Sequence, residues 1–216
     1  GCKSLIALKV SNCGELSDHA VELIVKSFPE LEELHLSVCG ISSLPEDIAN
    51  HLKRLKILSF GYNNLSDNAL ELIVTSFPTL EELYLIYCGI TSLPGDIGIH
   101  LKCLKRLNFQ RNNLSDHAVE LIVKSFPELE ELYLAHCGIT SLPENIGNHL
   151  QCLKILDLGF NKLTKLPRSI ANLADTCKEF YISGNPLQEP PIEIAKQGVK
   201  AVKRYFEELD RGAAGR

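Results

Sequence analysis

Two stretches of this sequence are nearly the same, and their repetition constrains the fold more than any other feature. Residues 64–94 recur 49 residues later as residues 113–143, and 25 of the 31 aligned positions are identical. Similarity at a fixed period is typical of repeat architectures, in which each unit buries its apolar side against the next one. The chain is therefore expected to be an array of stacked units.

Each 49-residue unit contains two copies of a shorter pattern, L-x-x-L-x-L-x-x-(N/C)-x-L. Full copies begin at six leucines, 24 or 25 residues apart: Leu31, Leu55, Leu80, Leu104, Leu129 and Leu153. Degenerate copies begin at Leu5 and Cys177, which gives eight coils. The pattern resembles the leucine-rich repeat family. The expected fold class is an α/β solenoid: a curved leucine-rich repeat array of about eight coils.

The alternation within L-x-L predicts which side chains of each strand face the core and which face solvent. Leu34 and Leu36 should point inward while Glu33 and His35 face solvent, and identical strands should stack in parallel ~4.8 Å apart. One position in each coil should form a buried ladder that satisfies the turning backbone, with Asn as a hydrogen-bonding amide and Cys as a small apolar residue. The ladder residues are Cys13, Cys39, Asn63, Cys88, Asn112, Cys137, Asn161 and Asn185.

The segments between the strands alternate in kind. Ser66 to Phe77 reads as an amphipathic helix with a Ser-Asp start and Pro78 after its end. Ile41 to Leu52 contains Leu44-Pro45, which favours an extended or short 3-10 path. Helices are wider than extended segments, so the parallel sheet should line a concave face, and α-helices alternating with short 3-10 or extended segments should line the convex face.

The domain organisation follows from this periodicity. A solenoid is expected over 1–188, with coils starting near residues 5, 31, 55, 80, 104, 129, 153 and 177. An amphipathic helix over 189–209 should cap its C-terminal end, and 210–216 should form a tail. No polar cap precedes Leu5, so the N-terminal end should be uncovered, either because the parent protein continues there or because the chain was cut.

Composition narrows the function classes. A formal net charge of −5 disfavours binding to nucleic acid. No apolar run approaches the ~20 residues that cross a bilayer, so no membrane association is expected. The eight cysteines include no C-x-x-C pair, and the Cys-rich caps of secreted relatives are missing, which favours reduced thiols and a cytoplasmic location.

Catalytic signatures are missing from the sequence. It contains no phosphate loop, no G-x-S-x-G, no H-E-x-x-H and no dinucleotide glycine motif. His51, His100 and His149 recur two coils apart, roughly 10 Å by strand spacing, too far to share one metal ion. We therefore expect no enzyme activity, no cofactor and no metal site.

The C-terminal segment suggests a parent architecture. Gly184-Asn185-Pro186-Leu187, Pro190-Pro191 and the run from Val202 to Phe206 resemble the segment that joins repeats to the GTPase domain in Roco proteins. The resemblance implies a recognition arm that precedes a GTPase. This chain itself has no phosphate loop.

The outward strand positions carry the remaining information. Five of the six tyrosines are expected on the concave face, where Tyr and Arg typically dominate binding energy. The candidate protein-binding residues are Tyr62, Tyr84, Tyr87, Arg106, Arg111, Tyr133, His136, Phe160 and Tyr181. Tyr84, Tyr87, Tyr133 and Phe160 would be anchors, with Arg106 and Arg111 orienting an acidic group. In an alternative interpretation, cross-strand aromatic residues only stabilise the sheet.

These observations favour a non-enzymatic interaction domain that binds a protein or peptide, as the recognition arm of a larger signalling protein. A second hypothesis is a regulatory or self-association arm that packs in cis on an adjoining GTPase or kinase domain. A monomer is expected, with weak self-association through the uncapped N-terminal end as the alternative.

Overall fold

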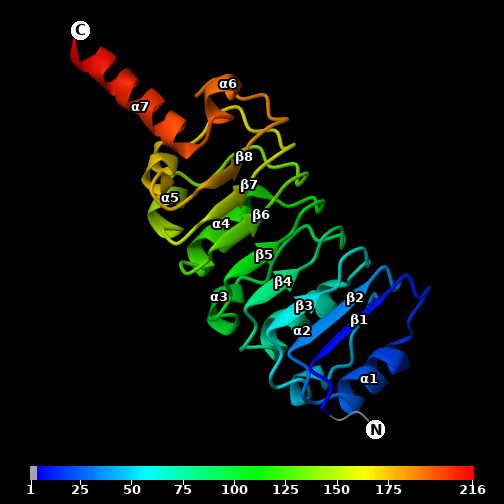
Figure 1. The fold of residues 1–216 in the computed structure, drawn as a ribbon. Coiled ribbons are helices and arrows are strands. Elements are labelled where there is room, and N and C mark those ends of the chain that lie inside the picture. The colour runs from blue at the N-terminus through cyan, green and yellow to red at the C-terminus, as the bar shows by residue number, and fades with distance from the viewer. Residues whose placement is uncertain (1–3) are drawn as a thin grey trace. The chain divides into compact units, whose positions relative to one another are not determined.

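The structure is a computed structural model that describes residues 4–216, and the chain divides into two compact units, Gly1–Asn112 (unit 1) and Asn113–Arg216 (unit 2). Strands and helical segments alternate along unit 1 (Figure 1). Its described elements are β1 (Ala7–Ser11), α1 (Asp18–Ser27), β2 (Glu33–Ser37), the 3-10 turn η1 (Ile48–Asn50), β3 (Ile57–Ser59), α2 (Asp67–Ser76), β4 (Glu82–Tyr84), α3 (Ile97–His100) and β5 (Arg106–Asn108).

Unit 2 continues the same alternation and ends in two helices. Its elements are α4 (Asp116–Ser125), β6 (Glu131–Tyr133), α5 (Ile146–His149), β7 (Ile155–Asp157), the 3-10 segment η2 (Arg168–Leu173), β8 (Glu179–Tyr181), α6 (Ile192–Ala195) and α7 (Val199–Ala214).

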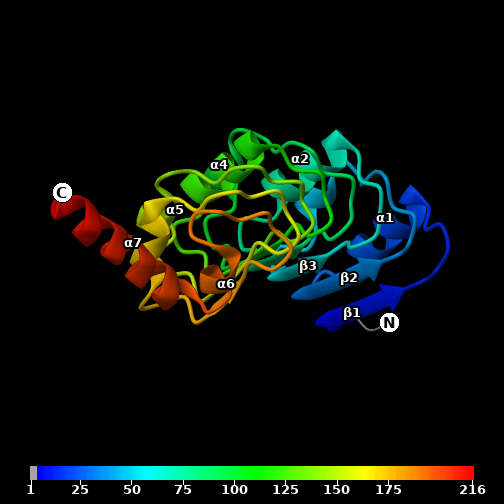
Figure 2. The same ribbon diagram turned by 90° about the horizontal axis from the view of Figure 1, so that it is seen from above.

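The strands of each unit pair in parallel and follow the order of the chain. In unit 1 the register places Leu8 opposite Leu34 and Leu34 opposite Leu58, and in unit 2 Leu132 lies opposite Leu156. In unit 1, β1, β2 and β3 lie on one side and helices α1 and α2 on the other (Figure 2). The repeating Leu of each coil therefore stacks on that of its neighbour.

The predicted alternation of the strands is confirmed. In β2, Leu34 and Leu36 are fully buried while Glu33, His35 and Ser37 are half-buried on the opposite face. Because every coil repeats this pattern, a leucine-lined core lies between strands and helices. The fold class is the α/β solenoid that the sequence predicts.

The helical segments differ from expectation in detail. Helix α2 begins at Asp67, and the Oγ of Ser66 accepts a hydrogen bond from the backbone N–H of Ala69 at 3.1 Å. Such a cap satisfies one of the free N–H groups of the first turn. The Leu-Pro segments end in short helical pieces: η1 is a 3-10 turn, as predicted, and η2 a longer 3-10 segment, whereas α3 and α5 are single α-helical turns.

The C-terminal segment is two helices, not the single helix expected over 189–209. Gly198 has a φ of 107° between α6 and α7, a conformation that only glycine adopts easily. Helix α7 reaches Ala214 and so includes most of the predicted tail. The buried ring of Phe206 lies 5.1 Å from the guanidinium of Arg168 in η2, which anchors α7 on unit 2.

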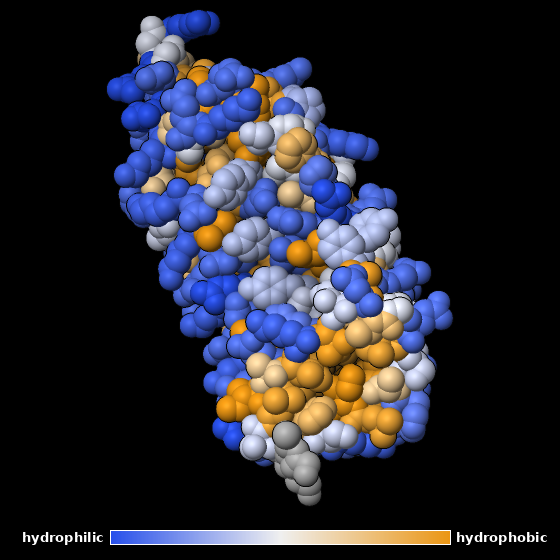
Figure 3. All heavy atoms as spheres, turned by 45° about the vertical axis from the view of Figure 1, so that its right-hand side comes forward, coloured by the Kyte–Doolittle hydropathy of each residue, from blue (hydrophilic) through white to orange (hydrophobic). Residues whose placement is uncertain are grey.

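The first coil of unit 1 is less buried than the coils that follow. Leu8, Val10 and Leu16 are only half-buried, whereas Leu34, which lies opposite Leu8 in the register, is fully buried. The side chain of Ile6 is 56% exposed. Hydrophobic residues gather on the surface at this end of unit 1 (Figure 3). The β1 side of unit 1 is therefore an apolar surface that no described residue covers.

Candidate interaction surface

A ladder of buried amides supports the turn that follows each strand. The Oδ1 of Asn63 accepts from the N–H groups of Cys39 and Ile41, both at 3.0 Å, and its Nδ2 donates to the carbonyls of Leu36 and Phe60. In unit 2, Asn161 makes the same bonds to Cys137 and Ile139 at 2.9 and 3.1 Å. Asn112 and Asn185 are also buried, as are Cys39, Cys88 and Cys137, whereas Cys13 is exposed. Each Asn thus ties its own turn to the coil before it.

This ladder holds a left-handed residue in each coil. The residue before the ladder position has a φ between 52° and 78° in all eight coils: Asn12, Val38, Tyr62, Tyr87, Arg111, His136, Phe160 and Gly184. Asn and Gly adopt this conformation easily, but for other residues it costs about 1–2 kcal/mol. The turn therefore directs one side chain per coil away from the core.

In unit 1 the predicted residues lie on β4 and β5 and in the turns that follow β3, β4 and β5. Tyr62 and Tyr87 are 50% and 60% exposed, and their ring centroids lie 5.5 Å apart. The hydroxyl of the half-buried Tyr84 donates to Glu82 at 2.8 Å.

The two arginines of unit 1 differ in their surroundings. Arg106 pairs with Glu82 at 3.0 Å, whereas Arg111 lies on the exposed surface. Arg106 is thus already engaged by a carboxylate, and Arg111 is the more accessible of the two predicted arginines.

In unit 2 the predicted residues of β6, β7 and β8 also lie on one face. The rings of His136 and Phe160 stack with centroids 4.6 Å apart and an interplanar angle of 5°. Tyr133 donates to Glu131 at 2.9 Å, and Tyr181, half exposed, donates to a carboxylate of its own strand in the same way. Burial and the hydrogen bond to Glu131 raise the pKa of Tyr133 to about 12, so its hydroxyl stays protonated at neutral pH.

Comparisons with known proteins agree with this geometry. The family model for leucine-rich repeats (two copies) matches residues 127–172. A solved leucine-rich repeat protein of Leptospira interrogans is 26% identical, with a TM-score of 0.65, over 89% of this chain and 52% of that one. The fold is a leucine-rich repeat solenoid. A search of curated protein sequences finds no match.

Two further solved structures share this leucine-rich repeat fold. The Arabidopsis receptor kinase HAESA, in complex with the peptide hormone IDA and the co-receptor SERK1, is 24% identical with a TM-score of 0.61, over 85% of this chain and 35% of that one. TLR13 in complex with ssRNA13 is 22% identical with a TM-score of 0.65, over 86% and 26%. This chain spans about half the length of the Leptospira structure and less of the other two.

Sequence reasoning places Glu82 and Glu131 in a row on the solvated face but does not pair them with the tyrosines, and it does not consider Glu179. Glu82, Glu131 and Glu179 each accept from the tyrosine two residues later on the same strand face. The spacing Glu-x-Tyr within a strand could have revealed them, because residues i and i+2 share a face. Gly184 is expected in the outward column, but its close approach to Phe160 was not foreseen: a Cβ there would lie 2.5 Å from the ring of Phe160.

Cysteine and histidine side chains have structural surroundings in this solenoid. The seven cysteines within residues 4–216 are free thiols. His51 and His100 each contact an aspartate four residues earlier, at 3.4 and 3.1 Å. Among the described residues, no three His, Cys, Asp or Glu side chains are placed to hold one metal ion. Nor does any helix within 4–216 combine the length and apolar character that a membrane crossing requires.

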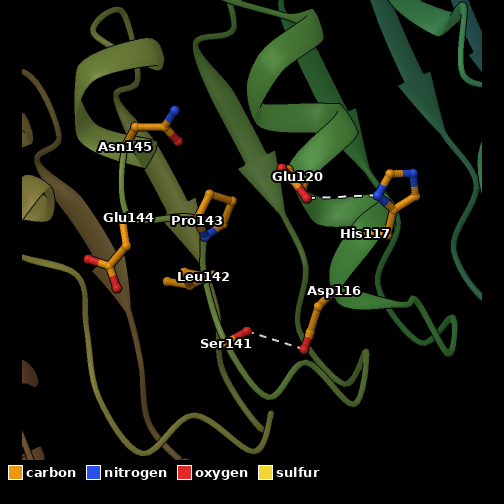
Figure 4. Close-up of a pocket in the computed structure, with 8 residues that line it drawn as sticks. All are labelled: Asp116, His117, Glu120, Ser141, Leu142, Pro143, Glu144 and Asn145. Atoms are coloured by element: carbon orange, nitrogen blue, oxygen red, sulfur yellow. Dashed lines mark hydrogen bonds and ion pairs between the residues drawn. The ribbon is translucent and has the colours of Figure 1, made fainter.

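A hollow of about 550 Å³ lies in unit 2 between α4 and a Leu-Pro loop (Figure 4). Burial alone would raise the pKa of Asp116 there, but hydrogen bonds from Thr140 and Ser141 outweigh it and lower the pKa. The carboxylate of Glu120 lies 3.8 Å from the ring of His117. These polar groups contact one another within the repeat, so the strand face is the stronger candidate for binding.

Proposed function

We propose that this chain is a non-enzymatic interaction domain that binds a protein or peptide on the strand face of its solenoid. The observation that carries this proposal is the exposed rings on left-handed backbone, which each unit carries on its own strand face. Phe160 is 58% exposed, Tyr62 and Tyr87 are about as exposed, and all three have a positive φ. Rings that are rigid and partly apolar dominate the energy of many interfaces.

Stability of the sheet is a weaker explanation of these rings. Aromatic pairs such as Tyr62–Tyr87 contribute about 0.5–1.5 kcal/mol beyond burial, while each ring residue in the left-handed region costs about 1–2 kcal/mol. For the two residues of such a pair the cost, about 2–4 kcal/mol, exceeds the gain. The turn also accepts Asn12 and Gly184, so it does not require a ring. A costly and exposed side chain points to a role in contact with another molecule.

The solved relatives offer both a peptide and a nucleic acid as precedents. HAESA was solved with a peptide hormone and TLR13 with ssRNA13. We favour a protein or peptide because the chain has a net charge of −5, whereas nucleic acids attract basic surfaces. The Roco-like tail supports a recognition arm within a larger signalling protein, and the free thiols support a reducing, cytoplasmic compartment.

Affinity capture from native-source lysate tests this function. The 216-residue chain is compared with a Tyr87→Ala/Tyr133→Ala variant and with Tyr205→Ala, a matched control because Tyr205 lies on α7. We expect a protein that the wild type and the control retain and that the double variant binds more than about tenfold more weakly, with little change in melting temperature. Equal capture by all three would contradict the proposal.

A second candidate function is a regulatory arm that packs on an adjoining GTPase or kinase domain in cis, or self-associates. The half-buried Leu8 and Val10 and the exposed Ile6 on the β1 side of unit 1 favour it, since contiguous apolar surface often marks an interface. Light scattering over a concentration series tests self-association, and Ile6→Lys should remove any concentration-dependent rise in mass. A constant monomer mass would exclude self-association and leave packing in cis as the only form of this second hypothesis.

A further inference from the structure

The same-face strand positions of unit 2 include carboxylates but no Lys or Arg of their own. Its three coils present four same-face positions each, and these twelve positions include three carboxylates but no Lys or Arg. Lys154 lies beside this face and pairs with Glu130 at 3.4 Å. The positions are Glu131, Tyr133, Ala135, His136, Ile155, Asp157, Gly159, Phe160, Glu179, Tyr181, Ser183 and Gly184.

Acidic and aromatic groups lie side by side on β7 and β8. The register places Asp157 opposite Tyr181 and Ile155 opposite Glu179 on neighbouring strands. The hydrogen bond to Glu179 and the charge of Glu179 raise the pKa of Tyr181, followed by burial and the charge of Asp157. Strands of one sheet are only about 4.8 Å apart, so one side chain of a ligand can contact both strands.

An aromatic platform lies on the same face, in the turn that follows β7, with Phe160 three residues after Asp157. Phe160 stacks on His136 and lies directly against Gly184, where a Cβ would come within 2.5 Å of the ring. The missing side chain at Gly184 thus leaves room for the ring. An exposed ring on the same face as a carboxylate three residues away favours a cation, which binds the ring through its quadrupole and the carboxylate by charge.

We propose that the strand face of unit 2 binds an arginine side chain of a basic peptide segment, which packs on the His136–Phe160 rings and donates to Asp157, with Glu179 adding negative charge farther along the same face. Arginine fits better than lysine because its planar guanidinium stacks on rings and donates several hydrogen bonds in one plane. The inference rests on the proposed function and adds that the partner is positively charged.

The fold itself does not require the charge at Asp157. Its Oδ1 accepts from the N–H of Gly159 at 3.0 Å, and in unit 1 Asn108 accepts from Gln110 in the same way at 2.9 Å. The solenoid therefore accommodates a neutral amide at this turn. Asp157→Asn removes the charge while it keeps the turn, which makes it a clean test.

Fluorescence anisotropy tests the proposal with a fluorescein-labelled glycine–serine peptide that carries several arginines. The same peptide with citrulline, the neutral isostere of arginine, is the ligand control. We expect the arginine peptide to bind about tenfold more tightly. Asp157→Asn should weaken it about threefold and Phe160→Ala more strongly, while Glu208→Gln, an exposed carboxylate on α7, should have no effect.

Two results would overturn the inference. One is equal binding of the arginine and citrulline peptides, and the other is arginine-peptide binding that Asp157→Asn and Phe160→Ala leave unchanged. The proposed function fails separately. A captured protein whose binding is lost in Phe160→Ala but kept in Asp157→Asn/Glu179→Gln would refute the basic partner and support the strand face. Capture that Phe160→Ala does not alter would argue against this face itself.

Discussion

The strand faces of the two units share a backbone but differ in charge. Tyr84 donates to Glu82 in unit 1 as Tyr133 donates to Glu131 in unit 2, at 2.8 and 2.9 Å. Opposite Glu82 in the register lies Arg106, whereas opposite Glu131 on β7 lies Ile155. Unit 1 therefore has a guanidinium beside its carboxylate, and unit 2 has an aliphatic side chain at the matching position.

This difference separates the scaffold from the surface it presents. The core leucines, the amide ladder and the left-handed turn are the same in both units because each coil must bury its apolar side and satisfy its backbone. Strand-face positions are under no such demand, so neighbouring units can offer different chemistry on the same framework.

The largest expected effect tests what the units share. Asn63→Leu in unit 1 and Asn161→Leu in unit 2 should each lower the free energy of unfolding by about 3 kcal/mol or more, because buried backbone groups would lose their partners. Urea unfolding followed by circular dichroism measures it, with Asn68→Leu on the exposed side of α2 as control. A markedly smaller loss in the free energy of unfolding in one unit would mean that the two ladders are not equivalent.

The next prediction reverses the difference in charge. Ile155→Arg places a guanidinium on the face of unit 2, where Arg106 stands in unit 1, and should weaken binding of the arginine peptide by about tenfold or more through repulsion and competition for the carboxylates. Anisotropy titration measures the change. Ile155→Leu, which alters the side chain without adding a charge, is the control. Full binding by Ile155→Arg would show that charge on this face does not select the ligand.

Alkaline pH should affect both units in the same direction. Burial raises the pKa of Cys88 in unit 1 and of Cys177 in unit 2 from 9.0 to about 11. The folded chain then holds these protons more tightly than the unfolded chain does, so this contribution is complete below pH 9 and is lost as the pH rises to about 11. Melting temperatures between pH 8 and 12 should fall, and less steeply in Cys88→Ala and Cys177→Ala. An unchanged slope would contradict the role of burial.

The smallest effect concerns the ring column. Tyr87→Gly and Phe160→Gly relieve the left-handed backbone but lose a ring contact, so the free energy of unfolding should change by less than about 1 kcal/mol. Binding of the captured partner should nevertheless fall. Thermal unfolding beside a binding assay separates the two quantities, and a large loss of stability would favour rings that merely hold the sheet together.

Much of the scaffold could be predicted from the sequence. The leucine spacing predicts the parallel strands, the inward face of Leu34 and Leu36, and the helix near residues 66–77, because these depend on local periodicity alone. The break at Gly198 and the extension of α7 to Ala214 escaped prediction, since an isolated glycine interrupts a helix only where the neighbouring packing directs the chain elsewhere.

The candidate surface was predicted in part. Spacing places Tyr62, Tyr87 and Phe160 outward, and the structure shows them exposed. The carboxylate at Glu179 and the space left by Gly184 were not anticipated, because both depend on which side chains meet across neighbouring coils.

The sequence by itself determined the repeat, the alternation along each strand and the position of the ladder, because these follow from periods that local sterics and burial impose. Only the tertiary structure decided that Arg106 faces Glu82, that His136 stacks on Phe160, and that the ring residues occupy left-handed backbone. Such contacts join residues about 24 positions apart in the chain, and only stacking of the coils brings them within reach.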